Sequence, residues 1–128
     1  GEVAHMLKDL RRAFREMGSR FGKERVKGLV EKTRLLGAAL EEGKCAGCLQ
    51  TLTEMTRETA ELLFDVRWTG DVTALIQDVG GHDEKFGAGI WCLENLRQSR
   101  EQAPGEDADH LDVLLGLYFL WHRVVERE

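Results

Sequence analysis

Cysteine and proline are scarce in this sequence, which has three cysteines and one proline among its 128 residues. A small and odd number of cysteines excludes a disulfide-stapled miniprotein and favours a reducing compartment. The chain also shows no charged-then-apolar leader and no Asn-x-Ser/Thr site. We therefore expect a cytoplasmic or nuclear protein.

Long hydrophobic runs are also absent. The longest one, Val113 to Trp121, is about half of the roughly 20 residues that a membrane span needs, so no membrane span is predicted. Nevertheless 42% of the residues are hydrophobic, which is enough to bury a core. The length suits one domain, and we expect residues 1–128 to form a single domain.

The sequence contains no assembled set of catalytic residues. It has no nucleophile elbow, no glycine-rich phosphate loop after a strand, and no inward-facing Glu-x-x-His arrangement of the di-iron type. The acidic residues fall on the polar faces of the expected helices. We therefore predict a protein that is not an enzyme and has no catalytic residue and no cofactor.

The sharpest local motif is Cys45-Ala-Gly-Cys48, because two thiols at this spacing can share a metal ion or form a redox pair. A structural zinc site needs two further ligands, and Cys92 and the scattered histidines do not obviously provide them. The prediction is that Cys48 packs in the core, that Cys45 lies at a helix start, and that no metal is bound.

Helical periodicity dominates the chain, because apolar residues recur every three or four positions and no stretch alternates as a strand does. The expected helices cover approximately residues 3–17, 26–40, 48–66, 72–79, 86–96 and 111–121. The short connections between them favour neighbouring helices that run in opposite directions. We therefore predict an all-α fold, an antiparallel bundle of five to six helices.

Helix ends are predicted from glycine and from capping residues. Gly43 is placed to end the second helix. The third helix is expected to stop near Trp68, where Thr69 can cap a short fourth helix. Gly80 and Gly81 are expected to break that helix. Two further glycines, Gly87 and Gly89, fall inside the fifth helix and predict close packing between helices.

Residues 99–109 are polar and hold the only proline, so they are expected to form a loop before a final apolar helix. That helix should start near Asp107 or Asp109. It is apolar nearly all round from Leu111 to Trp121, and such a helix must bury a second face against something. We expect self-association through this helix or the binding of a partner helix.

Aromatic side chains near the end of the final helix are the candidate partner-binding residues. They are Tyr118, Trp121 and His122. Aromatic residues anchor interfaces as well as cores, and these three lie on the final helix, which has a second apolar face to bury. The predicted partner is a protein, bound at this helix or as a helix in a groove.

Positive charge is concentrated in residues 8–34, which contain ten Lys and Arg residues and four acidic residues. This segment has a charge of +6, whereas the chain as a whole has −5, so the remainder has −11. Arg11, Arg12 and Arg15 are the candidate basic surface. Such a surface can bind nucleic acid or an acidic partner, or can face the acidic half of the protein itself, and we do not favour nucleic acid.

The pattern as a whole resembles a helical domain shared by the steroid receptor RNA activator protein and the C-terminal end of the outer-coat scaffold subunit of COPII vesicles. The resemblance covers about residues 4–100. It is carried by His5 to Met17, Lys23 to Val26, Arg34-Leu35-Leu36, Gly43-Lys44, Arg67-Trp68, Ile76, His82, Trp91, Leu93 and Leu96. It implies a five-helix bundle, in which such positions mostly serve packing, and a non-enzymatic adaptor or scaffold.

A second resemblance covers only Leu75 to Asp83. This segment is similar to the Trp-Ile-Gln-Asp-x-Gly-Gly-Trp-Asp segment of apoptosis regulators of the B-cell lymphoma family. Those proteins are helical bundles that bind an amphipathic partner helix in a groove. The leading prediction is therefore a protein–protein interaction module, with an apoptosis-regulator-like bundle and RNA binding through the basic helices as alternatives.

Overall fold

The structure, a computed structural model, describes residues 1–101 and 110–126. These residues form six α-helices and no β-strand, so the predicted all-α class is confirmed. The helices are α1 (Glu2–Phe21), α2 (Lys23–Glu41), α3 (Cys48–Phe64), α4 (Val72–His82), α5 (Glu84–Glu101) and α6 (His110–Val124).

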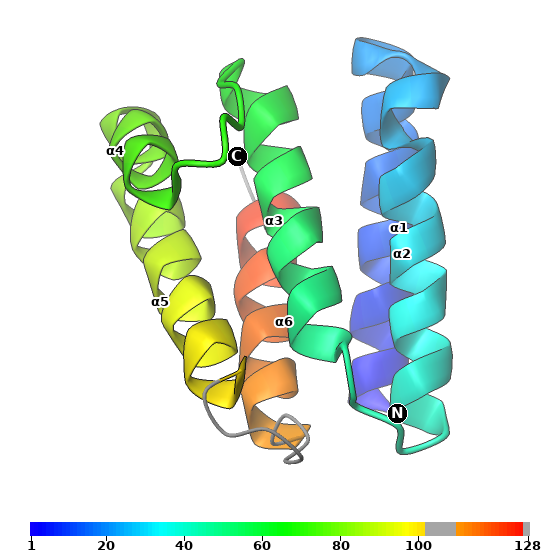
Figure 1. Cartoon of the computed structure of the whole chain (residues 1–128). Coiled ribbons are helices and arrows are strands. Elements are labelled where there is room, and N and C mark those ends of the chain that lie inside the picture. Colours follow the sequence, from blue (N-terminus) through cyan, green and yellow to red (C-terminus); the bar gives the residue numbers. More distant parts are fainter. Residues whose placement is uncertain (102–109, 127–128) are drawn as a thin grey trace.

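Helix α3 is the centre of the arrangement. Figure 1 shows α1 and α2 together on one side, α4 and α5 on the other, and α3 and α6 between them. Helix α3 packs against α2, α4, α5 and α6. Ten of its residues are buried, because apolar side chains point from it in several directions.

Two clusters of buried side chains form the core. The larger one joins α1, α2, α3 and α6 and includes Leu10, Phe14 and Leu117, none of which is exposed. The smaller one joins α3, α4 and α5 and includes Phe64 and Phe86, whose rings meet edge to face at 5.3 Å. Burying one such side chain contributes about 1.5–3 kcal/mol. The predicted helical periodicity therefore identified the packed faces correctly.

Four buried threonines satisfy their hydroxyl groups within their own helices. Each hydroxyl donates a hydrogen bond of 2.7–2.8 Å to the carbonyl oxygen four residues earlier. The four residues are Thr33, Thr53, Thr56 and Thr59. An unsatisfied hydroxyl in a core costs about 1–3 kcal/mol. Because each hydroxyl is satisfied within its own helix, these four threonines can pack in the core as apolar residues do.

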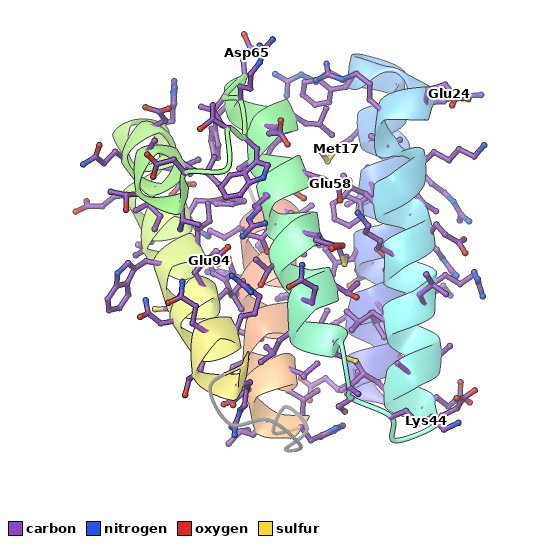
Figure 2. The ribbon with its side chains drawn as sticks, viewed as in Figure 1. Met17, Glu24, Lys44, Glu58, Asp65 and Glu94 are labelled. Atoms are coloured by element: carbon purple, nitrogen blue, oxygen red, sulfur yellow. The ribbon has the colours of Figure 1, made fainter. Side chains whose placement is uncertain are left out.

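A buried carboxylate connects α5 to α3. Glu94 is 2% exposed, the only charged residue of the described chain in the buried class. It accepts hydrogen bonds from Arg57 of α3 and, at 3.0 Å, from Arg97 of its own helix. The Arg57 guanidinium also lies 4.0 Å from the centre of the Trp68 ring, so the same cluster holds the connection between α3 and α4. Figure 2 shows Glu94 on the side of α5 nearest α3.

Gly43 ends α2 as predicted. It has a φ of 74°, a left-handed conformation that favours glycine. The Gly43 N–H donates to Leu40 O at 3.2 Å, and the Lys44 N–H donates to Ala39 O at 2.8 Å. This pair of bonds is the Schellman motif, which satisfies carbonyl groups that a helix end leaves free. Residues 44–47, which are not helical, follow this turn. Cys45 lies there, three residues before α3 begins at Cys48, so the predicted position of Cys45 at a helix start is wrong.

The predicted boundary between the third and fourth helices is wrong in two respects. Helix α3 ends at Phe64, before Trp68, and residues 65–71 form an irregular connection. Asp71, not Thr69, caps α4, since its carboxylate accepts a 3.2 Å hydrogen bond from the Ala74 N–H. Thr69 lies too early in the chain to reach the first free N–H groups of the helix.

Gly80 and Gly81 do not break α4, which continues to His82. The physical reason is the close approach of α5. A Cβ atom added at Gly87 would lie 2.9 Å from Gly80 Cα, so the two backbones nearly touch. A Cβ at Gly89 would lie 2.0 Å from the Phe119 ring of α6. The predicted role of Gly87 and Gly89 in close helix packing is confirmed.

The predicted loop at 99–109 begins too early, because α5 extends to Glu101. Residues 102–109, which include the expected helix start at Asp107 or Asp109, lie outside the described residues. As described, the final helix begins at His110.

Substitution of two glycines should change stability in opposite directions. Gly87→Ala should lower the free energy of unfolding by about 1–3 kcal/mol, because backbone atoms of α4 occupy the space that a Cβ needs. Gly81→Ala should raise it by up to about 1 kcal/mol, since no atom lies within 4 Å of its Cβ position and alanine favours helix. Urea denaturation of both variants tests this, and equal effects would contradict the close approach of α4 and α5.

Removing the charge of Glu94 should destabilise the protein strongly. Glu94→Gln removes the carboxylate charge that Arg57 and Arg97 contact, and the side chains of these two arginines are only 15% and 19% exposed. The expected loss is about 3 kcal/mol in urea denaturation. The matched control is Glu58→Gln, because Glu58 pairs with Lys32 at 2.8 Å but is 38% exposed. A control that lost as much stability as Glu94→Gln would show that burial is not what makes Glu94 important.

Candidate functional site

One face of α6 is apolar and open to solvent. Leu111, Leu115 and Tyr118 are 59%, 56% and 53% exposed. Their spacing of four and three residues places them in one row along the helix, and His122 continues this row. We call these four residues the α6 surface.

The opposite face of α6 is anchored in the core. Val113, Leu117 and Leu120 are fully buried. Gly116 brings α6 close to α3 and α5, since a Cβ there would lie 2.9 Å from Leu93 Cδ2 and 3.1 Å from Leu52 Cδ1. The helix is therefore held firmly on this side, while Leu111, Leu115 and Tyr118 on the other side stay more than half exposed. The sequence prediction that this helix has apolar surface to spare agrees with this arrangement.

The three predicted partner-binding residues lie together but differ in exposure. The Tyr118 ring lies 5.9 Å from the Trp121 ring and stacks on the His122 ring at 6.1 Å. Trp121 is only half-buried, and its Nε1–H donates to Asp9 Oδ2 of α1 at 3.2 Å. Trp121 therefore ties α6 to α1 and supports Tyr118, while Tyr118 and His122 are the members that reach solvent.

Leu111 and Leu115 were missed as candidates. The prediction singled out aromatic residues because aromatic side chains anchor interfaces. A signal existed, since Leu111, Leu115 and Tyr118 share one helical face at this spacing. Which face of an all-apolar helix stays open depends on its neighbours, so periodicity could not choose that face.

Ion pairs fix the edge of α6 that faces α5. Arg100 donates to Asp112 Oδ2 at 2.5 Å, and Arg123 donates to Asp83 Oδ1 at 3.4 Å. On the α6 surface itself, His122 lies 2.9 Å from Glu126 Oε1. The charges that border the apolar row thus contact one another, which leaves an uncharged centre suited to an apolar partner.

The three predicted basic residues all lie on α1 but have different surroundings. Arg12 lies 3.9 Å from Asp9 Oδ1 on the side near α6. Arg15 is exposed. Arg11 is half-buried and lines a hollow between α1 and α2. Arg11 and Arg12 therefore point toward different neighbours, Arg11 toward α2 and Arg12 toward α6, and a common basic surface stays a prediction.

The thiol motif is buried as predicted for Cys48, which is the first residue of α3. Cys45 is buried as well, and its Sγ lies 3.5 Å from His110 Nδ1 at the start of α6. Burial, and then the neighbouring Cys45, raise the pKa of Cys48 to about 11. Nowhere in residues 1–101 and 110–126 do three or more His, Cys, Asp or Glu side chains form a group arranged to hold a metal ion.

Comparison with known proteins gives no relative. The chain matches no family model, no curated protein and no solved structure. Within the part of the chain that the structure describes, no helix combines the length and the hydrophobicity that crossing a membrane requires. The interpretation of function therefore depends on the surfaces of this molecule alone.

The three cysteines should react with a thiol reagent at different rates. Cys92 is exposed and should react rapidly with a disulfide reagent at pH 8. Cys48 should react far more slowly, since a pKa of about 11 leaves roughly one thiol in a thousand ionised at that pH. Cys92→Ser should remove the fast phase, and three equal rates in the native protein would contradict the burial of Cys45 and Cys48.

Proposed function

We propose that this protein is a non-enzymatic protein–protein interaction module, an adaptor or scaffold, that binds a protein partner through the α6 surface. The observation that carries the proposal is the row of Leu111, Leu115 and Tyr118, each more than half exposed on a helix whose other side is buried. Contiguous exposed apolar surface on a soluble domain commonly marks an interaction site.

The α6 surface and Trp121 behind it suit recognition of an apolar helix. A row at this spacing presents side chains as ridges that pack into the grooves of a facing helix. Tyr118 adds a large, rigid ring with a polar tip, which is the residue type that dominates binding energy at interfaces. The hydrogen bond from Trp121 to Asp9 supports Tyr118 from behind, so less side-chain freedom is lost on binding.

The resemblance to the helical domain of the steroid receptor RNA activator protein and the COPII outer coat agrees with an adaptor role. In this proposal the helices form an antiparallel bundle in the cytoplasm or the nucleus. Leu36 and Leu93, two positions that carry the resemblance, are buried packing residues. Trp91, a third position, is 57% exposed, so it does not have the packing role that the resemblance implies for most such positions.

An apoptosis-regulator-like function ranks second. The segment that carries this resemblance, Leu75 to Asp83, forms most of α4 and the residue after it. Leu75 and Val79 are buried, so they support α4 and α5 and do not present a binding surface. RNA binding ranks third, because it would require the basic side of α1 to act without exposed aromatic residues beside it.

Two exposed leucines provide a matched test of the α6 surface. Leu115→Lys places a charge in the centre of the apolar row, whereas Leu35→Lys makes the same change on α2, where Leu35 is 49% exposed. Each variant and the unchanged protein would be used for affinity capture from cells of the source organism. Leu115→Lys should lower the yield of the bound partner at least about tenfold. Leu35→Lys should not change it.

The outcomes separate the functional alternatives. A protein partner retained at low and physiological salt, and lost only with Leu115→Lys, supports the proposal. A light-scattering mass that doubles with concentration, and does so only when Leu115 is intact, would identify the partner as a second copy. Recovery of RNA alone, with affinity that falls steeply as salt rises, would contradict the proposal in favour of the basic surface.

A further inference from the structure

A groove separate from the α6 surface runs along the outside of α1 and α2. It has a volume of about 860 Å³. Its floor is apolar and includes Val3, Leu7 and Leu40. Small residues on α2 keep it open, because Gly37 has no side chain and Ala38 has one carbon atom. A groove of this kind accepts the apolar face of a helix.

The charges along the groove are sorted by sign. Because α2 runs back along α1 (Figure 1), residues near the start of α1 lie beside residues near the end of α2. Glu2 and Glu41 therefore line one end. Lys8, Arg11 and Arg34 line the other end. The groove thus has an acidic end and a basic end with apolar floor between them.

Most of these charges have no partner within the described chain. Arg34 donates to Glu31 at 2.6 Å. By contrast, Lys8, Arg11, Glu2 and Glu41 form no ion pair with any residue in the described ranges. A ligand with charges at both ends would find ready counter-charges, and the sign pattern favours one placement of its ends.

We infer that this groove binds an amphipathic α-helix of a partner protein, with carboxylates lying at Lys8 and Arg11 and basic side chains at Glu2 and Glu41. The groove from Val3 to Arg11 is about 12 Å long, which matches about two turns of helix. Apolar side chains three and four residues apart on the ligand would contact Val3, Leu7 and Leu40. This inference goes beyond the proposed function, because it uses a second surface.

The same features argue against nucleic acid as the occupant. A phosphate backbone is uniformly negative and would be repelled by Glu2 and Glu41 at one end. Among the lining residues no aromatic ring other than the imidazole of His110 is available to stack on bases. An apolar floor between opposite charges is the chemistry of a peptide helix.

Steric block of the groove tests the inference. The probe is a fluorescently labelled amphipathic peptide helix that carries leucines on one face, glutamates at one end and lysines at the other. Ala38→Trp fills the groove from an exposed position on α2, and Ala88→Trp makes the same change at an exposed position on α5. Fluorescence anisotropy should show binding at least about tenfold weaker for Ala38→Trp. Binding to Ala88→Trp should not change.

Charge neutralisation tests the placement of the ends. Arg11→Gln should weaken binding about threefold, and higher salt should reduce this difference. Arg25→Gln is the control, because Arg25 is exposed on α2 and does not line the groove. The affinity of a peptide with glutamine at both ends should not change with Arg11→Gln. Circular dichroism of every variant would verify that its helices are intact.

Four outcomes would overturn the inference. One is absence of peptide binding, and another is equal binding to Ala38→Trp and Ala88→Trp. A loss of binding in Leu115→Lys but not in Ala38→Trp would place the peptide on the α6 surface and leave the proposed function standing. Single-stranded RNA that binds in place of the peptide, and is lost with Arg11→Gln, would assign the groove to nucleic acid.

Discussion

The pairing of Glu94 with Arg57 and Arg97 is the constraint on which the packing of α5 against α3 depends. A carboxylate that is 2% exposed must be paired, because an isolated buried charge is far less stable than a hydrated one. Glu94 meets Arg57 at only one register of α5 along α3. Since Arg57 also lies over Trp68, one cluster fixes two helices and the connection that leads to α4.

With α5 fixed, close contacts at three glycines determine where the remaining helices lie. Gly87 lets α4 approach α5, and Gly89 leaves room for Phe119 of α6. Gly116 in turn brings α6 against Leu52 and Leu93. Helix α6 is therefore inserted deeply along one side. Its other side stays more than half exposed at Leu111, Leu115 and Tyr118, and this geometry creates the α6 surface.

The two candidate binding surfaces have different physical characters. The α6 surface is a convex apolar row bordered by charges that contact one another. The groove between α1 and α2 is concave, and its charges at Lys8, Arg11, Glu2 and Glu41 have no counter-charge in the described chain. A convex apolar row suits an apolar helix or a second copy, whereas a groove with charged ends suits a helix with a defined direction. Together the two proposals describe a protein that contacts two partners at once, as an adaptor does.

Helical periodicity and composition were sufficient to predict the all-α class, the packed faces, the end of α2 at Gly43 and the close-packing roles of Gly87 and Gly89. The class, the packed faces and the end of α2 follow from local rules, because each depends on residues within a few positions along one helix. Glycine inside a helical pattern was the signal for Gly87 and Gly89, although the atoms that pack against them belong to α4 and α6. The sequence alone could not predict that α4 continues through Gly80, or that Asp71 caps it. It could not choose which face of α6 stays open, or sort the charges of α1 and α2 into the two ends of one groove. Only the tertiary structure decided these points, because each depends on which helix lies next to which.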